Sequence, residues 1–388
     1  MAPDDAVHAA IELPDQGARA GLRTWQRALL VVALLYVFLV GVSSIEAGIN
    51  ALGSETQAKL FENVTSPLAG LFVGILGTVL VQSSSVSTAT IVSLVATGVL
   101  SVDTAVPMVM GANIGTTITA TLASLGHVRR TDEFRRAFAA ATVHDVFNIL
   151  TVAILLPLEL ATGFLASTAT WLAELIGGSG GARFDSPIKE AVKGPVGWIE
   201  DLLGALGLHG NALGVATVAI GLLCIFVALF FIARNMRELV AERVERSFNR
   251  LLGRSSGVLA MALGLVVTMT VQSSSITTSI LIPLAASGIL TLENSYPVTL
   301  GANVGTTITA LLAALATDSS EALTIALVHT LFNVSGILLL YPLPVVRDVP
   351  IHIARGLADL AVDNRVLAVL AVGGVFVVLP LVGILIIG

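Results

Sequence analysis

Two short polar segments interrupt the apolar parts of this sequence with residues that are able to bind an ion. Each is a glutamine followed by three serines, at 82–85 and at 272–275, and more serines and threonines follow. Where such a segment opens a helix, its unpaired backbone N–H groups and the positive end of the helix dipole attract an anion. Serine hydroxyls add donors without a fixed charge. The candidate anion ligands are therefore Ser83, Ser84, Ser85, Ser273, Ser274 and Ser275.

The plainer role of serine in an apolar helix is to bond back to its own backbone or to hold two helices together. That role would suffice for a single serine. It does not account for a glutamine and three serines at the centre of two matched apolar segments. We therefore favour a binding site.

A second polar pattern follows each glutamine, as "GANIGTTITA" at 111–120 and "GANVGTTITA" at 301–310. Glycine and asparagine permit a break in a helix, and the freed carbonyls, with amide and hydroxyl oxygens, are ligands for a hard cation such as Na⁺. We predict a broken, cation-binding helix around Asn113 and around Asn303. The alternative is that the G-x-x-x-G spacing only packs two helices together.

A carboxylate and two histidines lie in a third matched pair of segments, "VHDVFN" and "VHTLFN". His144 and Asn148 share a helix face. Asp145 is costly inside a membrane unless it is paired, which makes it a functional candidate, although a structural pairing with His144 or an arginine remains open. The second copy has Thr330 at this position, so the two copies differ by one formal charge. We expect the histidines to make hydrogen bonds rather than to carry protons.

The elements that must position these residues are membrane helices. Of the 388 residues, 55% are hydrophobic and only 12% are charged, and long apolar runs recur along the chain, which indicates a multi-pass membrane protein rather than a soluble one. The single cysteine, Cys224, excludes an intrachain disulfide and a CxxC metal site. We expect the first apolar run to be an uncleaved span.

The sequence contains an internal repeat. Residues 81–125 align without gaps to 271–315, with about half of the positions identical. Each copy reads as a span, an apolar pair split at the glutamine, and two more spans. The halves of each pair, at 67–100 and 256–290, have about 14 residues and are too short for a ~30 Å hydrocarbon core, so we expect re-entrant hairpins. The expected spans are about 28–46, 104–125, 136–158, 210–233, 296–315, 322–343 and 366–387.

Loop charges indicate that the two copies are inverted. If the hairpins do not cross, the arginine-rich loops at 129–136 and 234–254 lie on the cytoplasmic side with the N-terminus, as the positive-inside rule requires. Each copy then crosses three times, and an odd number inverts the second copy, as in many secondary transporters that bind substrate at the repeat interface. We expect 234–254 to be a solvated helix, with anionic lipid or a partner as the alternative.

The predicted fold is thus an all-α polytopic membrane protein with two inverted-topology repeats, each with a re-entrant helical hairpin and a broken helix. Its expected parts are a cytoplasmic tail at 1–26, the first repeat at 27–160, an extracytoplasmic linker at 161–208, the second repeat at 209–346, and a cytoplasmic loop with a final transmembrane helix at 347–388.

These motifs, with "FRRAFAAATVHDVFN" and "YPLPVVRDVPIHIARGLA", resemble those of the type II sodium/phosphate cotransporters from about residue 28 to 387. The resemblance implies sodium-driven import of inorganic phosphate across the plasma membrane by alternating access. It implies that the serine tips bind phosphate, and that the sodium ligands are Gln82, Gln272, Thr306, Thr309, Asp145 and Asn148. We add Thr116 and Thr119 to the sodium ligands, and Asn113 and Asn303 to the phosphate ligands.

Asp145 bears on the coupling ratio. Family members with an acid there look electrogenic, with three sodium ions per divalent phosphate and one net positive charge per cycle. The chain differs from vertebrate members in its short, cysteine-free central loop, which suggests a bacterial protein of the inner membrane, and in its single span after the second repeat, which places the C-terminus outside. Ala302 replaces a usual serine, and 126–131 lacks a glutamine and an aspartate; both changes concern one sodium site.

The expected partners are inorganic phosphate, sodium and the lipid bilayer, with no nucleic acid and no cofactor, since sodium acts as the coupling ion. We expect no enzyme activity, because His144 and Asp145, as sequence neighbours, point to different helix faces and do not suit a serine nucleophile. An anion channel, a proton-coupled carrier and another oxyanion such as sulfate remain alternatives.

Overall fold

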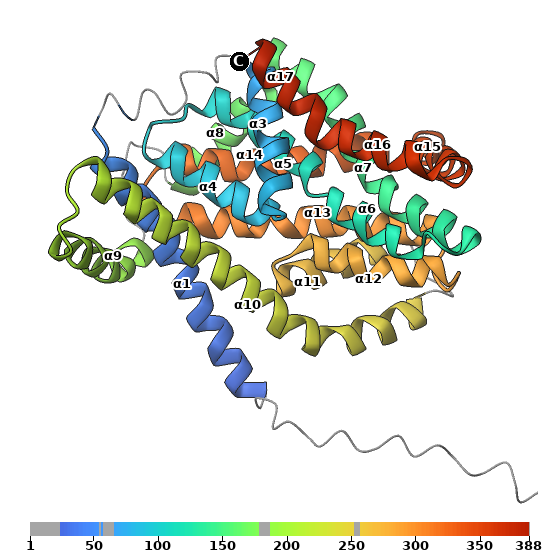
Figure 1. Ribbon diagram of the computed structural model, residues 1–388, viewed down its shortest axis with the longest axis horizontal. Coiled ribbons are helices and arrows are strands. Elements are labelled where there is room, and N and C mark those ends of the chain that lie inside the picture. Colours follow the sequence, from blue (N-terminus) through green and yellow to red (C-terminus); the bar gives the residue numbers. More distant parts are fainter. Residues whose placement is uncertain (1–23, 54–55, 57–65, 178–186, 252–256, 388) are drawn as a thin grey trace, which may run out of the picture.

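The computed structural model describes residues 24–53, 56, 66–177, 187–251 and 257–387, which form helices and no strand (Figure 1). The helices of the first half are α1 (Thr24–Ala51), α3 (Pro67–Val81), α4 (Ser84–Ala96), α5 (Val102–Gly115), α6 (Ile118–Ser124), the short 3₁₀ helix η1 (Leu125–His127), α7 (Thr131–Thr162), α8 (Phe164–Gly177) and α9 (Pro187–Ala205). Those of the second half are α10 (Asn211–Leu251), α11 (Gly257–Val271), α12 (Ser274–Ala286), α13 (Leu292–Leu315), α14 (Ser320–Leu340), α15 (Pro344–Asp363), α16 (Arg365–Gly373), the π-helical η2 (Gly374–Val378) and α17 (Leu379–Ile387).

Within the described residues, seven helical segments are long and apolar enough to cross a membrane, and each covers one predicted span. They are Trp25–Ala51, Val102–His127, Thr131–Thr162, Asn211–Met236, Leu292–Leu315, Ser320–Leu340 and Arg365–Ile387. The chain is therefore a multi-pass, all-helical membrane protein. The N-terminal tail expected at 1–26 lies outside the described residues up to residue 23, as do the side chains of the arginine-rich stretch from 237 onward.

The two split apolar pairs form helical hairpins of matched shape. Helices α3 and α4 meet at Gln82, and α11 and α12 meet at Gln272. All four helices have 13 or 15 residues, or about 20 to 23 Å at 1.5 Å per residue, which is shorter than a hydrocarbon core of ~30 Å. The predicted hairpins with their glutamine tips are present.

The predicted helix break is present in the first copy and wrong in the second. Helix α5 ends at Gly115 and α6 begins at Ile118, whereas α13 runs unbroken through its GANVGTT segment. The two segments differ only in Ile114 and Val304, so the motif itself does not decide the break. The surroundings differ instead, because Asp145 accepts a hydrogen bond from Thr121 of α6, and the matched position in α13 is Leu311.

Two further differences concern length. Helix α10 continues to Leu251, well past the expected end of its span near 233, so the arginine-rich stretch extends a membrane helix. The linker predicted at 161–208 contains two helices, α8 and α9. The carboxylate of Glu159 caps the first of them by accepting the backbone N–H groups of Leu165 and Ala166.

Glycines set the closest helix contacts. A Cβ atom built on Gly74 of α3 would lie 2.0 Å from the carbonyl oxygen of Met108 in α5, and the matched Gly264 of α11 would lie equally close to Val298 of α13. In the GANxGTT segments, Gly111 would similarly meet the Leu71 carbonyl oxygen at 2.0 Å. The G-x-x-x-G spacing therefore has the packing role that sequence offered as the alternative, in both copies.

Helices α1 and α10, the first of each copy, lie side by side and antiparallel (Figure 1). Gly41 meets Gly221, and Gly48 meets Gly214, with each added Cβ within 2.6 to 2.8 Å of the facing carbonyl oxygen. Around the polar centre, Phe147 and Phe332, at matched positions of α7 and α14, are fully buried. Close backbone contacts and large buried aromatics thus hold the two copies together.

We predict that Gly74→Ala lowers the stability of the protein by about 3 kcal/mol, since the added methyl overlaps a backbone carbonyl that has no room to move. Thermal unfolding in detergent measures the change. Gly77→Ala, on the same helix with nothing within 4 Å of its added Cβ, is the matched control and should leave the unfolding temperature unchanged or raise it. Equal effects of the two substitutions would contradict the packing.

Candidate functional site

The two hairpin tips depend on glutamines in an unusual backbone conformation. Gln82 and Gln272 are the only non-glycine residues with positive φ in the described part of the chain, and both have φ of 56°. A left-handed conformation costs an L-residue about 1 to 2 kcal/mol and is kept only where the surroundings fix it. Here it ends one helix, and the next one starts two residues later.

The glutamine side chains stabilise these turns in the same way. The Nε2 of Gln82 donates to the carbonyl oxygen of Val79 at 2.5 Å, and its Oε1 accepts from Thr119 at 3.2 Å. The Nε2 of Gln272 donates to the carbonyl oxygen of Met269 at 2.6 Å, and its Oε1 accepts from Thr309 at 2.8 Å. Each glutamine thus closes its own helix end and ties the tip to a threonine of the GANxGTT helix.

The serines after each glutamine open a new helix, as sequence predicts. Ser83 and Ser273 are the N-caps of α4 and α12, and their hydroxyls accept from the backbone N–H groups of Val86 and Ile276. The first N–H groups of a helix have no carbonyl partner within it. Both tips therefore present free backbone donors and serine hydroxyls at the start of a helix, which is a suitable arrangement for an anion.

The two tips contact one another. The hydroxyl of Ser85 donates to the backbone oxygen of Gln272 at 3.3 Å and accepts from Thr309 at 3.4 Å. The neighbouring Ser84 is buried and donates to Thr116 at 3.0 Å. Predicted phosphate ligands of the first copy are therefore bonded directly to predicted sodium ligands of both copies.

Asparagines and histidines link the two copies by a crossed pair of bonds. His144 of α7 shares a hydrogen bond of 2.6 Å with Asn303 of α13, and His329 of α14 shares one of 3.4 Å with Asn113 of α5. Asn148 donates to the backbone oxygen of Asn113 and accepts from Asn303. The histidines have the hydrogen-bonding role that their matched positions predicted.

Asp145 lies apart from the other predicted ligands. It is 7% exposed, its Oδ2 accepts from Thr121 at 3.1 Å, and its Oδ1 is buried with no hydrogen-bond partner. Within the described residues it is paired neither with His144 nor with an arginine. The structural pairing considered from sequence is therefore absent, and the carboxylate keeps a free oxygen for a ligand.

Some predicted residues do not join these contacts. Thr306 bonds back to Ala302 of its own helix, and the hydroxyl of Ser275 has no printed contact with the other tip. The amides of Asn113 and Asn303 are engaged with histidine and asparagine partners, so their assignment to phosphate stays a prediction.

Sequence reasoning missed Thr121, although a signal was present. Between the copies, Thr121 is replaced by Leu311 just as Asp145 is replaced by Thr330. Two differences at matched positions in otherwise similar segments indicate that the residues form one unit, and the hydrogen bond between them confirms it. His127 and Arg130, which stand in the loop noted for its departures, both contact Glu133 at the start of α7.

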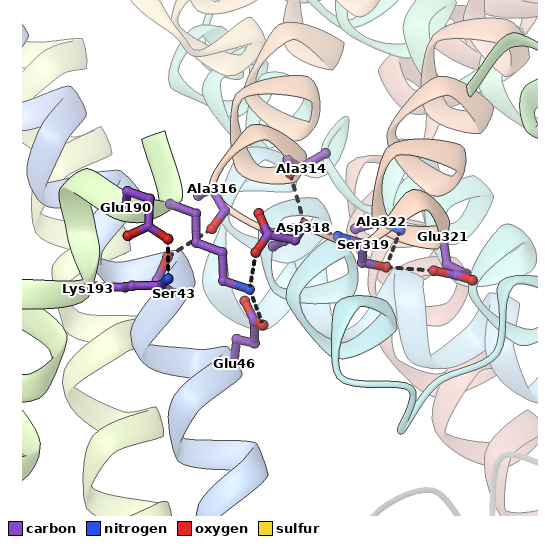
Figure 2. Close-up of polar contacts among 12 residues, drawn as sticks. Ser43, Glu46, Glu190, Lys193, Ala314, Ala316, Asp318, Ser319, Glu321 and Ala322 are labelled. Atoms are coloured by element: carbon purple, nitrogen blue, oxygen red, sulfur yellow. Dashed lines mark hydrogen bonds and ion pairs between the residues drawn. The ribbon is translucent and has the colours of Figure 1, made fainter. Parts of the chain in front are cut away.

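A second cluster that sequence did not predict joins the linker to both copies. In Figure 2, Glu46 of α1 and Asp318, in the turn between α13 and α14, point toward one another. Lys189 of α9 lies between them, with its Nζ 3.1 Å from Glu46 and 3.0 Å from Asp318. Nearby, Ser43 donates to the backbone oxygen of Ala316 at 3.0 Å (Figure 2).

Charge explains why the lysine remains there. Burial lowers the pKa of Lys189, but hydrogen bonds and charge interactions with Asp318 and Glu46 outweigh that effect and raise the pKa above its ordinary value. The ammonium group therefore stays protonated and holds α9, α1 and the α13–α14 turn together.

The fold and site define a class of protein: a multi-pass helical membrane protein whose two copies of one unit each bring a polar hairpin tip to a shared, partly hydrated centre. A sequence model of the Na⁺/Pi-cotransporter family matches residues 37–171 and 214–342, one segment in each copy, and the chain belongs to that family.

Curated relatives include the sodium-dependent phosphate transport protein 2A of Rattus norvegicus, 34% identical over 423 residues that cover 90% of this chain and 66% of that protein. The sodium-dependent phosphate transport protein 2B of Homo sapiens is 32% identical over 444 residues, covering 92% of this chain and 64% of that protein. The chain thus spans about two thirds of the length of these relatives. No solved structure matches the chain.

We predict that Lys189→Met lowers the stability by about 1 to 3 kcal/mol, since it removes a donor to two partly buried carboxylates. Because the folded pKa of Lys189 is raised, the stabilisation is complete below the ordinary lysine pKa of about 10.4 and is lost as pH rises through the folded value. Thermal unfolding of wild type and variant should therefore differ at pH 7 and converge at strongly alkaline pH.

The control is Lys193→Met on the same helix. Lys193 is 57% exposed and pairs only with its neighbour Glu190, so its removal should change stability by less than about 0.5 kcal/mol. If both variants lose the same stability, the linkage through Lys189 is refuted.

Proposed function

We propose that this protein imports inorganic phosphate through the membrane, driven by the sodium gradient. The observation that carries the proposal is the contact between the two hairpin tips, where Ser85 of one tip bonds to Gln272 and Thr309 of the other. Membership of the Na⁺/Pi-cotransporter family and the names of the relatives support it. No covalent step is needed, and sodium is the coupling ion rather than a cofactor.

Phosphate binding falls to the helix starts at the tips. The backbone N–H groups at the beginnings of α4 and α12, with the serines at 83–85 and 273–275, would donate to the phosphate oxygens. Neither tip contains a lysine or arginine, so attraction depends on dipoles and hydroxyls. This favours release, because a fixed positive charge at the site would hold the divalent anion more tightly.

Sodium binding falls to the oxygen pairs beside the tips. Oε1 of Gln82 with the Thr119 hydroxyl, and Oε1 of Gln272 with the Thr309 hydroxyl, already lie within 3.2 Å of one another. Amide, hydroxyl and carbonyl oxygens suit a hard cation. The further predicted ligands Thr116, Thr306, Asp145 and Asn148 belong to the same proposal.

Coupling follows from the shared residues. A sodium ion held by Gln272 and Thr309 would fix the two groups that Ser85 contacts, and so would orient a phosphate donor of the other copy. Phosphate affinity then rises when sodium is bound, and by reciprocity sodium affinity rises when phosphate is bound. A carrier of this kind moves both solutes together.

We propose that the copies have inverted topology and that the hairpins are re-entrant, so that the site is exposed to each side in turn. The antiparallel contact of α1 with α10 and the crossed bonds His144–Asn303 and His329–Asn113 support a two-fold relation in the membrane plane. The N-terminus would be cytoplasmic in a plasma membrane, the linker at 161–208 extracytoplasmic, and the loop from 347 cytoplasmic.

We further propose that transport is electrogenic, with three sodium ions per divalent phosphate. Asp145 supports this, because its free, buried Oδ1 needs a positive charge nearby and finds none among the described residues. One net charge per cycle would gain about 2.3 kcal/mol per 100 mV from the membrane potential.

The proposed role of Asp145 is tested with protein reconstituted in liposomes. Radiolabelled phosphate uptake is measured with an inward sodium gradient, with and without an inside-negative potential. Wild-type uptake should require sodium and rise with the potential, and Asp145→Gly should lose that rise. Thr330→Gly, at the matched position of the second copy, controls for the loss of a side chain from the helix and should keep it.

Uptake that ignores sodium would refute the cotransporter and favour a proton-coupled carrier or a channel. Sodium-dependent uptake that responds to the potential equally in wild type and Asp145→Gly would leave the cotransporter intact and refute only the role of Asp145.

The sodium pair at the second tip is tested by Thr309→Val, which keeps the shape and removes the oxygen. We expect the sodium concentration for half-maximal uptake to rise about tenfold, as the loss of one ligand worth about 1.4 kcal/mol implies. Thr270→Val changes an exposed threonine that bonds only to its own helix and should leave the value unchanged. An unchanged value in Thr309→Val would remove this residue from the sodium site.

A further inference from the structure

A cavity with almost wholly apolar walls lies beside Asp145. It has a volume of about 210 Å³ and is bounded by α7, α15 and the final span. Side chains from all three elements line it, among them Phe138 and Ile149 of α7, Leu360 of α15, and Ala371 and Val375 of the final span. Figure 1 shows these helices together at one end of the protein.

The cavity has one acidic group in its wall. Asp145 is 93% buried, and its Oδ1 lacks a hydrogen-bond partner. The other polar side chain there, Thr142, already donates to the backbone oxygen of Phe138. The cavity therefore offers a ligand apolar walls and a single unused acceptor, and that acceptor is a carboxylate.

The final span is irregular where it borders the cavity. Residues Gly374–Val378 form a π-helical turn, and Val375 and Phe376 of that turn line the cavity. Single π turns within α-helices are frequent at functional sites, because they shift the side chains of one turn. This observation is independent of Asp145 and concerns a different element of the same cavity.

We propose that this cavity binds amphiphilic amines, with the ammonium group at Oδ1 of Asp145 and the alkyl chain along the walls formed by α7, α15 and the final span. Charge complementarity selects the amine, since a neutral molecule of the same shape leaves the acceptor unused, and the apolar walls select an alkyl chain over an inorganic cation. Bound there, the amine excludes sodium from Asp145. This consequence for transport rests on the proposed function, whereas the binding itself does not.

The probes are hexylammonium and its neutral analogue hexanol. Saturation-transfer NMR with the detergent-solubilised protein measures binding without any transport. Hexylammonium should bind at least about tenfold more tightly than hexanol, as a charge-assisted hydrogen bond implies. Asp145→Asn, which keeps the shape and removes the charge, should abolish that preference.

Phosphate uptake into liposomes measures the consequence. Hexylammonium should raise the sodium concentration for half-maximal uptake and leave the maximal rate unchanged. Ala371→Phe fills the cavity from the final span, far from the hairpin tips, and should keep uptake while losing both the binding and the inhibition by hexylammonium.

Equal binding or inhibition by hexanol would overturn the proposal, because it would indicate a general effect on the bilayer or micelle. So would inhibition that persists in Ala371→Phe, or inhibition that high sodium does not relieve. If the untreated protein takes up no phosphate at all, the proposed function fails, and the NMR result still decides whether the amine site exists.

Discussion

The structure depends on two glutamines that end one helix and allow another to begin in the middle of a hydrophobic region. In lipid, a helix end must have its backbone groups satisfied by the protein itself. Gln82 and Gln272 meet this requirement by accepting a left-handed conformation, by bonding the last carbonyls of α3 and α11, and by holding Thr119 and Thr309. The same turns leave the starts of α4 and α12 open to a ligand, so the element that satisfies the fold also creates the site.

Symmetry and its local failure divide the labour of the site. The glutamine–threonine pairs, the serine N-caps, the close glycine contacts and the crossed histidine–asparagine bonds occur in both copies. Asp145 and Thr121 occur in one copy alone, opposite Thr330 and Leu311 in the other. Matched residues suit a centre that must be reached from two sides, whereas the unmatched carboxylate introduces one charge and an interrupted helix on one side only. The apolar cavity borders this unmatched side.

Much of this arrangement can be predicted from sequence, because apolar length and repetition determine spans and hairpins. The seven spans, the tips at the glutamines and the N-cap position of the first serines follow from such patterns. The unbroken α13 does not, because its motif is nearly identical to that of α5 and α6, and the difference lies in contacts with distant residues. Lys189 is hidden for the same reason: it meets Glu46 and Asp318 across 143 and 129 positions of sequence, and no local pattern indicates such a contact.

The most direct test of the central claim is an electron cryo-microscopy structure of the protein in nanodiscs with saturating sodium and phosphate, compared with one in potassium and without phosphate. The account predicts density for a tetrahedral anion between the tips, within hydrogen-bond distance of the first N–H groups of α4 and α12 and of the serine hydroxyls, and only in the first sample. Anion density elsewhere, or tips that remain in direct contact with no density between them in saturating phosphate, would contradict it.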